Sequence, residues 1–261
     1  MKFEEIKNII LTDTFINEAY YFDSVNSTND FLKSTHELDN VLAVAGYQTH
    51  GRGRLNHKWE SEPDKNLIFS IKKKLDMKYK SLFTVNFYFS YLLLKSIEDF
   101  LKSESPNVDT EKFSIKWPND LLFDNKKFSG ILMENNLIKK EYIIGIGVNV
   151  NQDKFLDEYN ANTTSLSIIS RRIIDTWKLL VQILKCFSEN IELLSLEKSS
   201  QIYKLWKSKC KIIGKTVDFI QPNKEIQSAQ VIDINDDGSI KLKVNNKISD
   251  FYSGEIKLVT N

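Results

Sequence analysis

The pattern of apolar and polar positions divides the chain into a long mixed region and a short region of strands. Up to about residue 205, apolar runs of strand length alternate with segments in which apolar residues recur at helical spacing. Strands are predicted at residues 20–25, 41–47, 67–73, 113–116, 121–123, 128–135 and 142–150. Helices are predicted at residues 29–38, at 82–101 and from 168 to about 205.

The end of the chain differs, because its pattern predicts only short strands. These strands cover residues 216–220, 227–234, 239–244 and 247–252, and turn residues such as Asp236-Asp237-Gly238 separate them. A run of about 50 residues with strands this short is typical of a small β-barrel, here appended to an α/β or α+β core. We therefore expect a mixed α/β or α+β domain at residues 1–209 and a β domain at residues 210–261.

Composition excludes several classes of protein. Hydrophobic residues make up 41% and charged residues 27%, which is typical of a globular chain rather than a disordered one. The formal net charge of +1 provides no global attraction to DNA or to an anionic membrane. Polar residues interrupt the longest apolar stretch, at 83–97, and the N-terminus lacks the apolar segment of a signal peptide. With two cysteines and no metal-ligand spacing, we expect a soluble cytoplasmic protein.

The basic residues are nearly all lysine. Among 36 Lys and Arg, the four arginines are Arg52, Arg54, Arg171 and Arg172. An arginine in such a chain indicates a position that needs the planar guanidinium fork. Arg171 and Arg172 fit a solvated helix surface, whereas Arg52 and Arg54 alternate with glycine after a strand. That loop is a candidate anion cradle. The alternatives are a flexible basic surface loop or, with Trp59, a nucleic-acid contact.

Two further motifs interrupt predicted strands. In Lys116-Trp117-Pro118-Asn119-Asp120 the proline excludes helix geometry, so a cation and an anion lie at a rigid bend. Gly130 weakens the strand that follows Lys127, and Gly145 and Gly147 weaken the next one. A ligand lying against the backbone accounts for these glycines, and so does a β-bulge or a closely packed helix. The bend alone is equally typical of a turn with an exposed ion pair.

Amides and hydroxyls occur beside these motifs. Ser27, Thr28 and Asn29 follow the first strand, where they either cap a helix or hydrogen-bond a neutral polar ligand. Asn149 follows the two glycines, and its amide can pair with the edge of a heterocycle.

Taken in order, five motifs resemble the biotin protein ligase (biotin–[carboxylase] ligase) family. They are Ser-Thr-Asn, Gly-Arg-Gly-Arg with a following Trp, Lys-Trp-Pro-Asn-Asp, Lys-x-x-Gly-Ile-Leu and Gly-Ile-Gly-x-Asn, within about residues 20–151. The resemblance implies an α+β fold. Its parts are a class II synthetase-like catalytic domain, with a mixed sheet flanked by helices, and a small C-terminal SH3-like β-barrel. It also implies that biotin and Mg-ATP give biotinyl-5′-AMP and pyrophosphate, after which one lysine of a biotin carboxyl carrier protein or domain receives the biotinyl group.

Matching positions imply the residue roles. Catalytic roles fall on Arg54, Lys116, Asp120 and Lys127. Biotin contacts fall on Ser27, Thr28, Asn29, Gln48, Arg52, Gly53, Arg54, Lys127 and Gly130. Nucleotide contacts fall on Arg52, Arg54, Trp59, Lys116, Asn119 and Asn149. The cofactors implied are ATP and Mg²⁺, with no certain protein ligand for the metal. Asp120 serves either the incoming carrier lysine or Mg²⁺.

We call residues 48–59 the arginine loop. The sequence departs from the family pattern in this loop, where Asn56 and His57 follow Leu55. Asn tolerates a left-handed turn, while a neutral His57 puts a phosphate contact in doubt. Only 26 residues precede Ser27, which is too few for a DNA-binding module of about 60, so no operator binding is expected. The competing functions are a lipoate–protein ligase and a non-catalytic biotin-sensing or nucleic-acid-binding protein. The chain is expected to be a monomer or a homodimer that does not bind membranes.

Overall fold

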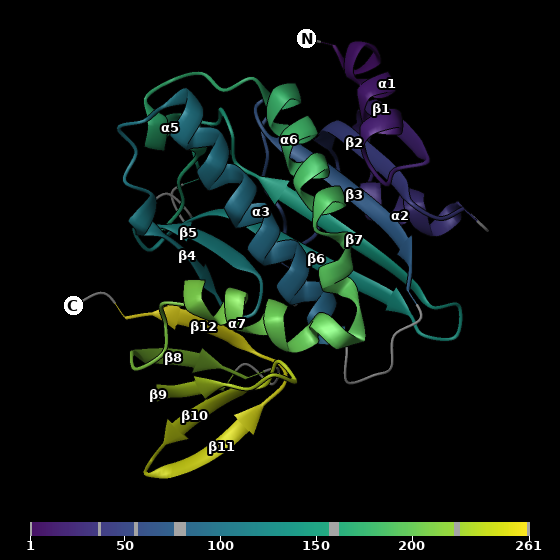
Figure 1. The fold of residues 1–261 in the computed structure, drawn as a ribbon. Helices are drawn as coiled ribbons and strands as arrows, with labels where there is room; N and C mark the ends of the chain where they lie inside the picture. Colours follow the sequence, from purple (N-terminus) through teal and green to yellow (C-terminus); the bar gives the residue numbers. More distant parts are fainter. Residues whose placement is uncertain are drawn as a thin grey trace.

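The structure is a computed structural model, and it describes residues 2–35, 38–54, 57–75, 82–156, 162–221 and 225–259. These residues form a large mixed sheet with helices on both faces, followed by a smaller antiparallel sheet (Figure 1). The α+β class and the separate C-terminal β region agree with the sequence-based prediction.

The large sheet has seven strands in the order β1-β2-β3-β7-β6-β5-β4. Their bounds are β1 Glu18–Val25, β2 Val41–Gln48, β3 Leu67–Lys74, β4 Phe113–Lys116, β5 Asp120–Phe123, β6 Lys126–Asn136 and β7 Glu141–Val148. The first two strands are parallel, and all other neighbours are antiparallel. Strands β2 and β3 are almost fully buried, which explains their continuous apolar runs.

Helices cover the two faces of this sheet unequally. On one face, α3 (Leu82–Glu104) packs against α6 (Thr176–Glu189) and α7 (Ser199–Lys209), and α1 (Phe3–Asp13) packs against α6 (Figure 1). The short helix α2 (Thr28–Ser34) packs against β2, β3 and β7 through a separate apolar cluster that includes Leu32 and Ile143. The remaining helical pieces are α5 (Leu166–Ser170) and the 3-10 turns Thr110–Lys112, Ile191–Leu194 and Leu196–Lys198.

The C-terminal sheet is antiparallel in the order β11-β10-β9-β8-β12. Its strands are β8 Thr216–Ile220, β9 Ile226–Ile234, β10 Ile240–Val244, β11 Lys247–Phe251 and β12 Glu255–Leu258. The apolar core is continuous from the large sheet into this one. Trp117 Nε1 donates to the Gly238 carbonyl at 2.9 Å, and the Tyr203 hydroxyl donates to the Ile234 carbonyl at 2.6 Å. A sheet this small gains most of its stability from such shared packing.

Five local predictions are wrong or incomplete. Helix α1 and strand β12 were not predicted, and helix α2 ends at Ser34 instead of continuing to residue 38. The single helix predicted from residue 168 is three helices separated by turns. Arg171 ends α5 with a left-handed φ of 55°, and the Arg172 guanidinium donates to the Glu104 carbonyl at 2.6 Å. The two arginines therefore cap a helix end and tie it to α3, and they do not lie on a helix surface.

None of the helices in the described part of the chain combines the length and hydropathy that crossing a membrane requires.

Candidate active site

The sheet brings three of the sequence motifs into register. Gly130 on β6 lies opposite Asp120 on β5 and opposite Gly147 on β7. A register shift between Leu121 and Leu122 marks a bulge next to this row, as the glycine in the strand suggested. The motifs that contain Asp120, Gly130 and Gly147 are separate in the sequence, but the sheet places them side by side.

Three charged side chains meet at one end of this row, and we call Asp120, Lys116 and Lys127 the Asp120 triad. Lys127 Nζ lies 2.7 Å from Asp120 Oδ1, and Lys116 Nζ lies 2.9 Å from Asp120 Oδ2. Burial alone raises the pKa of Asp120, but the two ammonium groups outweigh it and hold that pKa well below its usual range. Lys116 also donates to the Ile256 carbonyl of β12 at 3.2 Å, so the C-terminal sheet contributes to the site.

The bend that carries the triad is anchored on three sides. Its Trp117–Pro118 peptide bond is cis, and Asn86 of α3 donates to the Pro118 carbonyl at 2.7 Å. Trp117 is buried against the C-terminal sheet. The Asn119 side chain is buried as well, and its amide donates to the Ile131 carbonyl on β6. Asn119 thus holds the bend to the sheet, and its predicted nucleotide contact remains a prediction.

The arginine loop folds back over the glycines of β6 and β7. Within it, Trp59 N–H donates to the Gly51 carbonyl at 3.1 Å, and Gly53 N–H donates to the His57 carbonyl at 2.7 Å. A Cβ atom at Gly147 would lie 2.4 Å from two indole carbons of Trp59, so only glycine permits this stacking. The space that the glycines leave is therefore occupied by the chain's own Trp59. Leu55 and Asn56 lie outside the described residues, so the question raised by Asn56 is not addressed.

The two arginines of the loop point to different partners. The Arg54 guanidinium lies 6.0 Å from the centre of the Trp117 ring. Burial lowers the pKa of Arg54, and the nearby carboxylates of Asp120 and Glu255 partly offset this effect. Arg52 instead donates to Asp30 of α2 at 2.5 Å, away from the Asp120 triad. Ion pairs with α2 and β6 hold Arg52, and its predicted contacts with biotin and nucleotide remain predictions.

Beside the loop lies a neutral polar cluster, which we call the hydroxyl–amide chain: Gln48, Thr28, Ser70 and Asn29. Gln48 Oε1 accepts from Thr28 N–H at 2.8 Å and lies 3.0 Å from the Thr28 hydroxyl. The Thr28 and Ser70 hydroxyls are 2.6 Å apart, and Ser70 donates to Asn29 Oδ1 at 2.6 Å. Thr28, Ser70 and Asn29 are all buried. Buried groups bonded in this way present fixed donors and acceptors to a neutral ligand.

Two of the predicted contacts serve the fold in this structure. The Ser27 hydroxyl accepts from Asp30 N–H and caps α2, which is the alternative that the sequence left open. Asn149 donates to the Thr164 carbonyl at 3.1 Å, so one amide N–H is used within the chain. Biotin or nucleotide contacts of these residues remain predictions.

Sequence reasoning missed three residues that complete the site. Ser70 interrupts the buried run Leu-Ile-Phe-Ser-Ile of β3, and a hydroxyl in such a strand was a usable signal. Glu134 accepts from Asn29 Nδ2 at 2.8 Å, and Glu255 of β12 lies 3.2 Å from His57 Nε2. Glu134 and Glu255 had no signal in the local sequence, because Asn29 and His57, which they contact, are distant in the chain.

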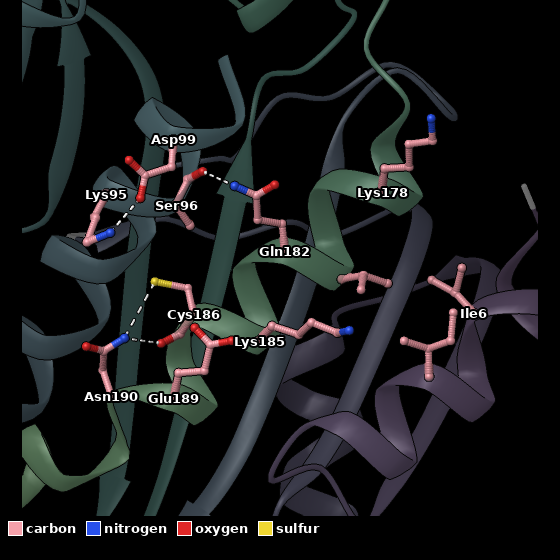
Figure 2. Close-up of a pocket in the computed structure, with 12 residues that line it drawn as sticks. Ile6, Lys95, Ser96, Asp99, Lys178, Gln182, Lys185, Cys186, Glu189 and Asn190 are labelled. Atoms are coloured by element: carbon pink, nitrogen blue, oxygen red, sulfur yellow. Dashed lines mark hydrogen bonds and ion pairs between the residues drawn. The ribbon is translucent and has the colours of Figure 1, made fainter. Parts of the chain in front are cut away.

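Another cavity lies on the opposite, helical face. It has a volume of about 440 Å³ between α1, α3 and α6, and Figure 2 shows the ion pair of Lys95 and Asp99 beside Cys186. Burial raises the pKa of the Cys186 thiol to about 11, so this thiol is a poor nucleophile at neutral pH. None of the site residues predicted from the sequence lines this cavity.

The donor set gives little support to a metal held by the protein. No group of three or more His, Cys, Asp or Glu among the described residues could hold a metal ion. Asp120, the carboxylate of the triad, already binds two ammonium groups. The described residues therefore offer no cluster of three protein ligands for a metal ion.

Known proteins are similar to this chain over most of its length. The model of the Biotin/lipoate A/B protein ligase family matches residues 21–151, and that of the biotin protein ligase C-terminal domain matches residues 212–259. The bifunctional ligase/repressor BirA of Bacillus subtilis is 31% identical, covering 97% of this chain and 78% of that protein. BirA of Escherichia coli is 25% identical, covering 90% and 72%.

Solved structures agree. The biotin protein ligase of Aquifex aeolicus in complex with biotin and ATP superimposes with a TM-score of 0.74 at 27% identity, covering 93% of this chain and 98% of that one. The Leishmania major enzyme in complex with biotinyl-5-AMP, at 18% identity and a TM-score of 0.65 over 91% and 99%, shows the shared fold. The sequence-based prediction of family and fold is confirmed, and the chain belongs to the biotin/lipoate A/B protein ligase family, with the C-terminal domain of the biotin protein ligases.

Proposed function

We propose that the chain is an ATP-dependent biotin–protein ligase. In the first step a biotin carboxylate oxygen bonds to the α-phosphorus of ATP, and the bond to pyrophosphate breaks. In the second step the amine of a carrier lysine bonds to the acyl carbon, and the bond to AMP breaks while the nitrogen loses a proton to water. The carrier that we propose is the biotin carboxyl carrier domain of a biotin-dependent carboxylase, such as acetyl-CoA carboxylase.

The observation that carries this proposal is a site with two chemically different ends. The hydroxyl–amide chain is neutral and directional, which suits the ureido ring of biotin. Lys116, Lys127 and Arg54 are cations at the other end, where two anions must approach each other. Trp59 lies against Gly147 and Gly130, and we propose that it excludes water from the reacting groups.

We assign Asp120 to positioning rather than to proton transfer. Its lowered pKa keeps it ionised at neutral pH, so it is a weak base that orients ammonium groups. It holds Lys116 and Lys127 now, and the same chemistry suits the carrier lysine. We propose that Mg²⁺ enters bound to ATP as part of the substrate, because the described residues provide no metal cluster.

The neutral end also favours biotin over lipoate. A dithiolane ring has no hydrogen-bonding groups, so lipoate would leave unpaired the Gln48 NH₂ group, which the internal bonds of the hydroxyl–amide chain do not use. A site built to bond polar groups discriminates strongly against an analogue that lacks them. We propose a cytoplasmic reaction, which the free thiols of Cys186 and Cys210 support.

The experiment measures pyrophosphate release from ATP with biotin or lipoate, followed by the mass of an added carrier domain. We expect release with biotin only, and a carrier heavier by one biotinyl group on a single lysine. Release with lipoate alone would make the chain a lipoate ligase. Biotin binding without pyrophosphate release would indicate a non-catalytic sensing protein.

A further inference from the structure

The hydroxyl–amide chain does not end in the pocket. Asn29 Nδ2 donates to Glu134 Oε2 on β6 at 2.8 Å and to the Leu132 carbonyl at 3.4 Å. Glu134 Oε1 in turn accepts from Lys33 Nζ at 2.8 Å, and Glu134 Oε2 lies 3.8 Å from Arg52 Nη2. Glu134 is thus the junction between a buried neutral network and an exposed charged one.

The carboxylate determines the direction of every bond in the buried network. An ionised carboxylate only accepts, so the Asn29 amide must turn its NH₂ group towards Glu134 and its oxygen towards Ser70. Ser70 then donates to Asn29, and its oxygen is left to accept from Thr28. Thr28 Oγ1 has two acceptors within reach, Ser70 Oγ at 2.6 Å and Gln48 Oε1 at 3.0 Å. Because Ser70 donates to Asn29, Thr28 is the donor of the shorter contact, and Gln48 Oε1 keeps Thr28 N–H as its donor. The Gln48 NH₂ group consequently remains as a donor for a ligand.

The amide of Asn29 packs closely against the β7 backbone. A Cβ atom at Gly145 would lie 2.4 Å from Asn29 Oδ1, so only glycine leaves room for this side chain. The reversed amide would bring its oxygen to the Glu134 carboxylate, where two acceptors repel each other. Removing the carboxylate therefore removes the strongest of the contacts that select one orientation.

The charged side of the junction ties the arginine loop to the sheet. Arg52 donates to Asp30, and Lys33 pairs with both Asp30 and Glu134, so two acids and two bases alternate. Burial lowers the pKa of Lys33, but its hydrogen bonds to Glu134 and Asp30 outweigh this and raise it. The loop that carries Trp59 is held at this point to α2 and β6 together.

We propose that Glu134 is a positioning residue that fixes the hydrogen-bond direction of the biotin pocket and links that pocket to Arg52 of the arginine loop. It does not touch the ligand; it acts through Asn29 on one side and Arg52 on the other. The inference rests on the proposed function, because it names biotin as the ligand whose binding depends on Glu134.

Two variants separate the two effects. Glu134→Gln loses the charge but keeps an oxygen that can accept from Asn29, whereas Glu134→Met loses both. We expect Glu134→Met to raise the KM for biotin about tenfold or more while the KM for ATP changes less than threefold. Glu134→Gln should raise the KM for biotin less than threefold, but release preformed adenylate several times faster because Arg52 is held more weakly. The matched control is Asp99→Asn, which removes an exposed pair with Lys95 on the helical face and should change neither quantity.

A ligand-free measurement keeps the inference separate from the proposed function. The side-chain NH₂ resonances of Asn29 should shift in Glu134→Met and stay unchanged in Asp99→Asn. If the native protein releases no pyrophosphate with biotin, the proposed function fails, whatever the resonances show. If Glu134→Met lies within threefold of the native protein in the KM for biotin and in adenylate release, the inference is wrong. It is equally wrong if the KM values for biotin and ATP rise together with a loss of thermal stability, because Glu134 would then be merely structural.

Discussion

The Asp120 triad lies on β4, β5 and β6, whereas the hydroxyl–amide chain lies on α2, β2 and β3, and the two ends of the site work by different physics. At the triad, one carboxylate binds two ammonium groups within 2.9 Å, and the attraction between opposite charges acts from any direction. In the hydroxyl–amide chain, Thr28, Ser70 and Asn29 are uncharged, and each contact depends on which atom carries the proton. Charge tolerates small displacements, whereas hydrogen-bond direction does not.

Because of this difference, we expect the Asp120 triad to stabilise the reacting anions and the hydroxyl–amide chain to discriminate between ligands. Cations at the triad stabilise any anion of suitable size, so they lower barriers to phosphoryl chemistry without identifying the acid that reacts. The neutral chain stabilises little charge, but it penalises a ligand that leaves its buried atoms unpaired. Variants at the two ends should therefore affect different kinetic constants.

The largest expected effect follows from removing a cation. Lys127→Met should lower kcat/KM for pyrophosphate release by about 10²–10³-fold, because one donor to developing negative charge is lost. Steady-state kinetics with both substrates varied measures the effect. Lys126→Met removes an exposed neighbouring lysine and should be nearly silent. Equal losses in the two variants would contradict a specific role for Lys127.

The neutral end should show a smaller and more selective loss. Thr28→Val keeps the shape but leaves Ser70 without its donor, so we expect the KM for biotin to rise about 5–100-fold with the KM for ATP unchanged. Initial rates at saturating ATP measure this. Ser96→Ala, which removes a buried hydroxyl bonded to Leu93 in α3, is the control for lost stability. If the KM for ATP rose equally, the two ends would not be separable.

The triad should also be visible in the pH dependence of stability. The folded-state pKa of Asp120 lies below the unfolded value of about 4. Its contribution is therefore fully present above pH 4 and is lost as the pH falls towards the folded pKa. Asp120→Asn should lower the free energy of unfolding by about 1–3 kcal/mol at pH 6, and by less at pH 3.

Urea denaturation at both pH values measures this change. Asp124→Asn, which breaks a pair with Lys112 that is mostly exposed, should change stability little at either pH. A deficit for Asp120→Asn that grew as the pH fell would show that the sign is wrong.

How much of this site the sequence predicted depends on how far apart its parts lie in the chain. Lys116 and Asp120 flank one proline bend, and Lys127 precedes Gly130 on one strand, so local rules placed them correctly. Ser70 on β3 and Glu134 on β6 contact Asn29 only because both strands lie next to β7, which follows from the sheet order. The sheet order is set by the packing of the whole domain, and no local pattern encodes it.

The same limit explains the contribution of the C-terminal sheet. Strand β12 was not predicted, and the atom that it offers to Lys116 is the carbonyl oxygen of Ile256, which has no side-chain signature. The partners of Arg52 were not predicted for another reason, since the loop pattern gave its composition but not the acids of α2 and β6 that hold it.

The smallest expected effect lies where the loop meets the C-terminal sheet. His57 and Glu255 are 3.2 Å apart, but the His57 side chain is 59% exposed, so solvent screens the pair. His57→Gln, Glu255→Gln and the double variant should give a coupling free energy of about 0.2–1 kcal/mol in adenylate retention, which is less than about fivefold in rate. The dissociation rate of labelled adenylate measures it in all four proteins. A coupling free energy above this range would mean that the contact of His57 with Glu255 holds the arginine loop as strongly as the ion pairs of Arg52 do.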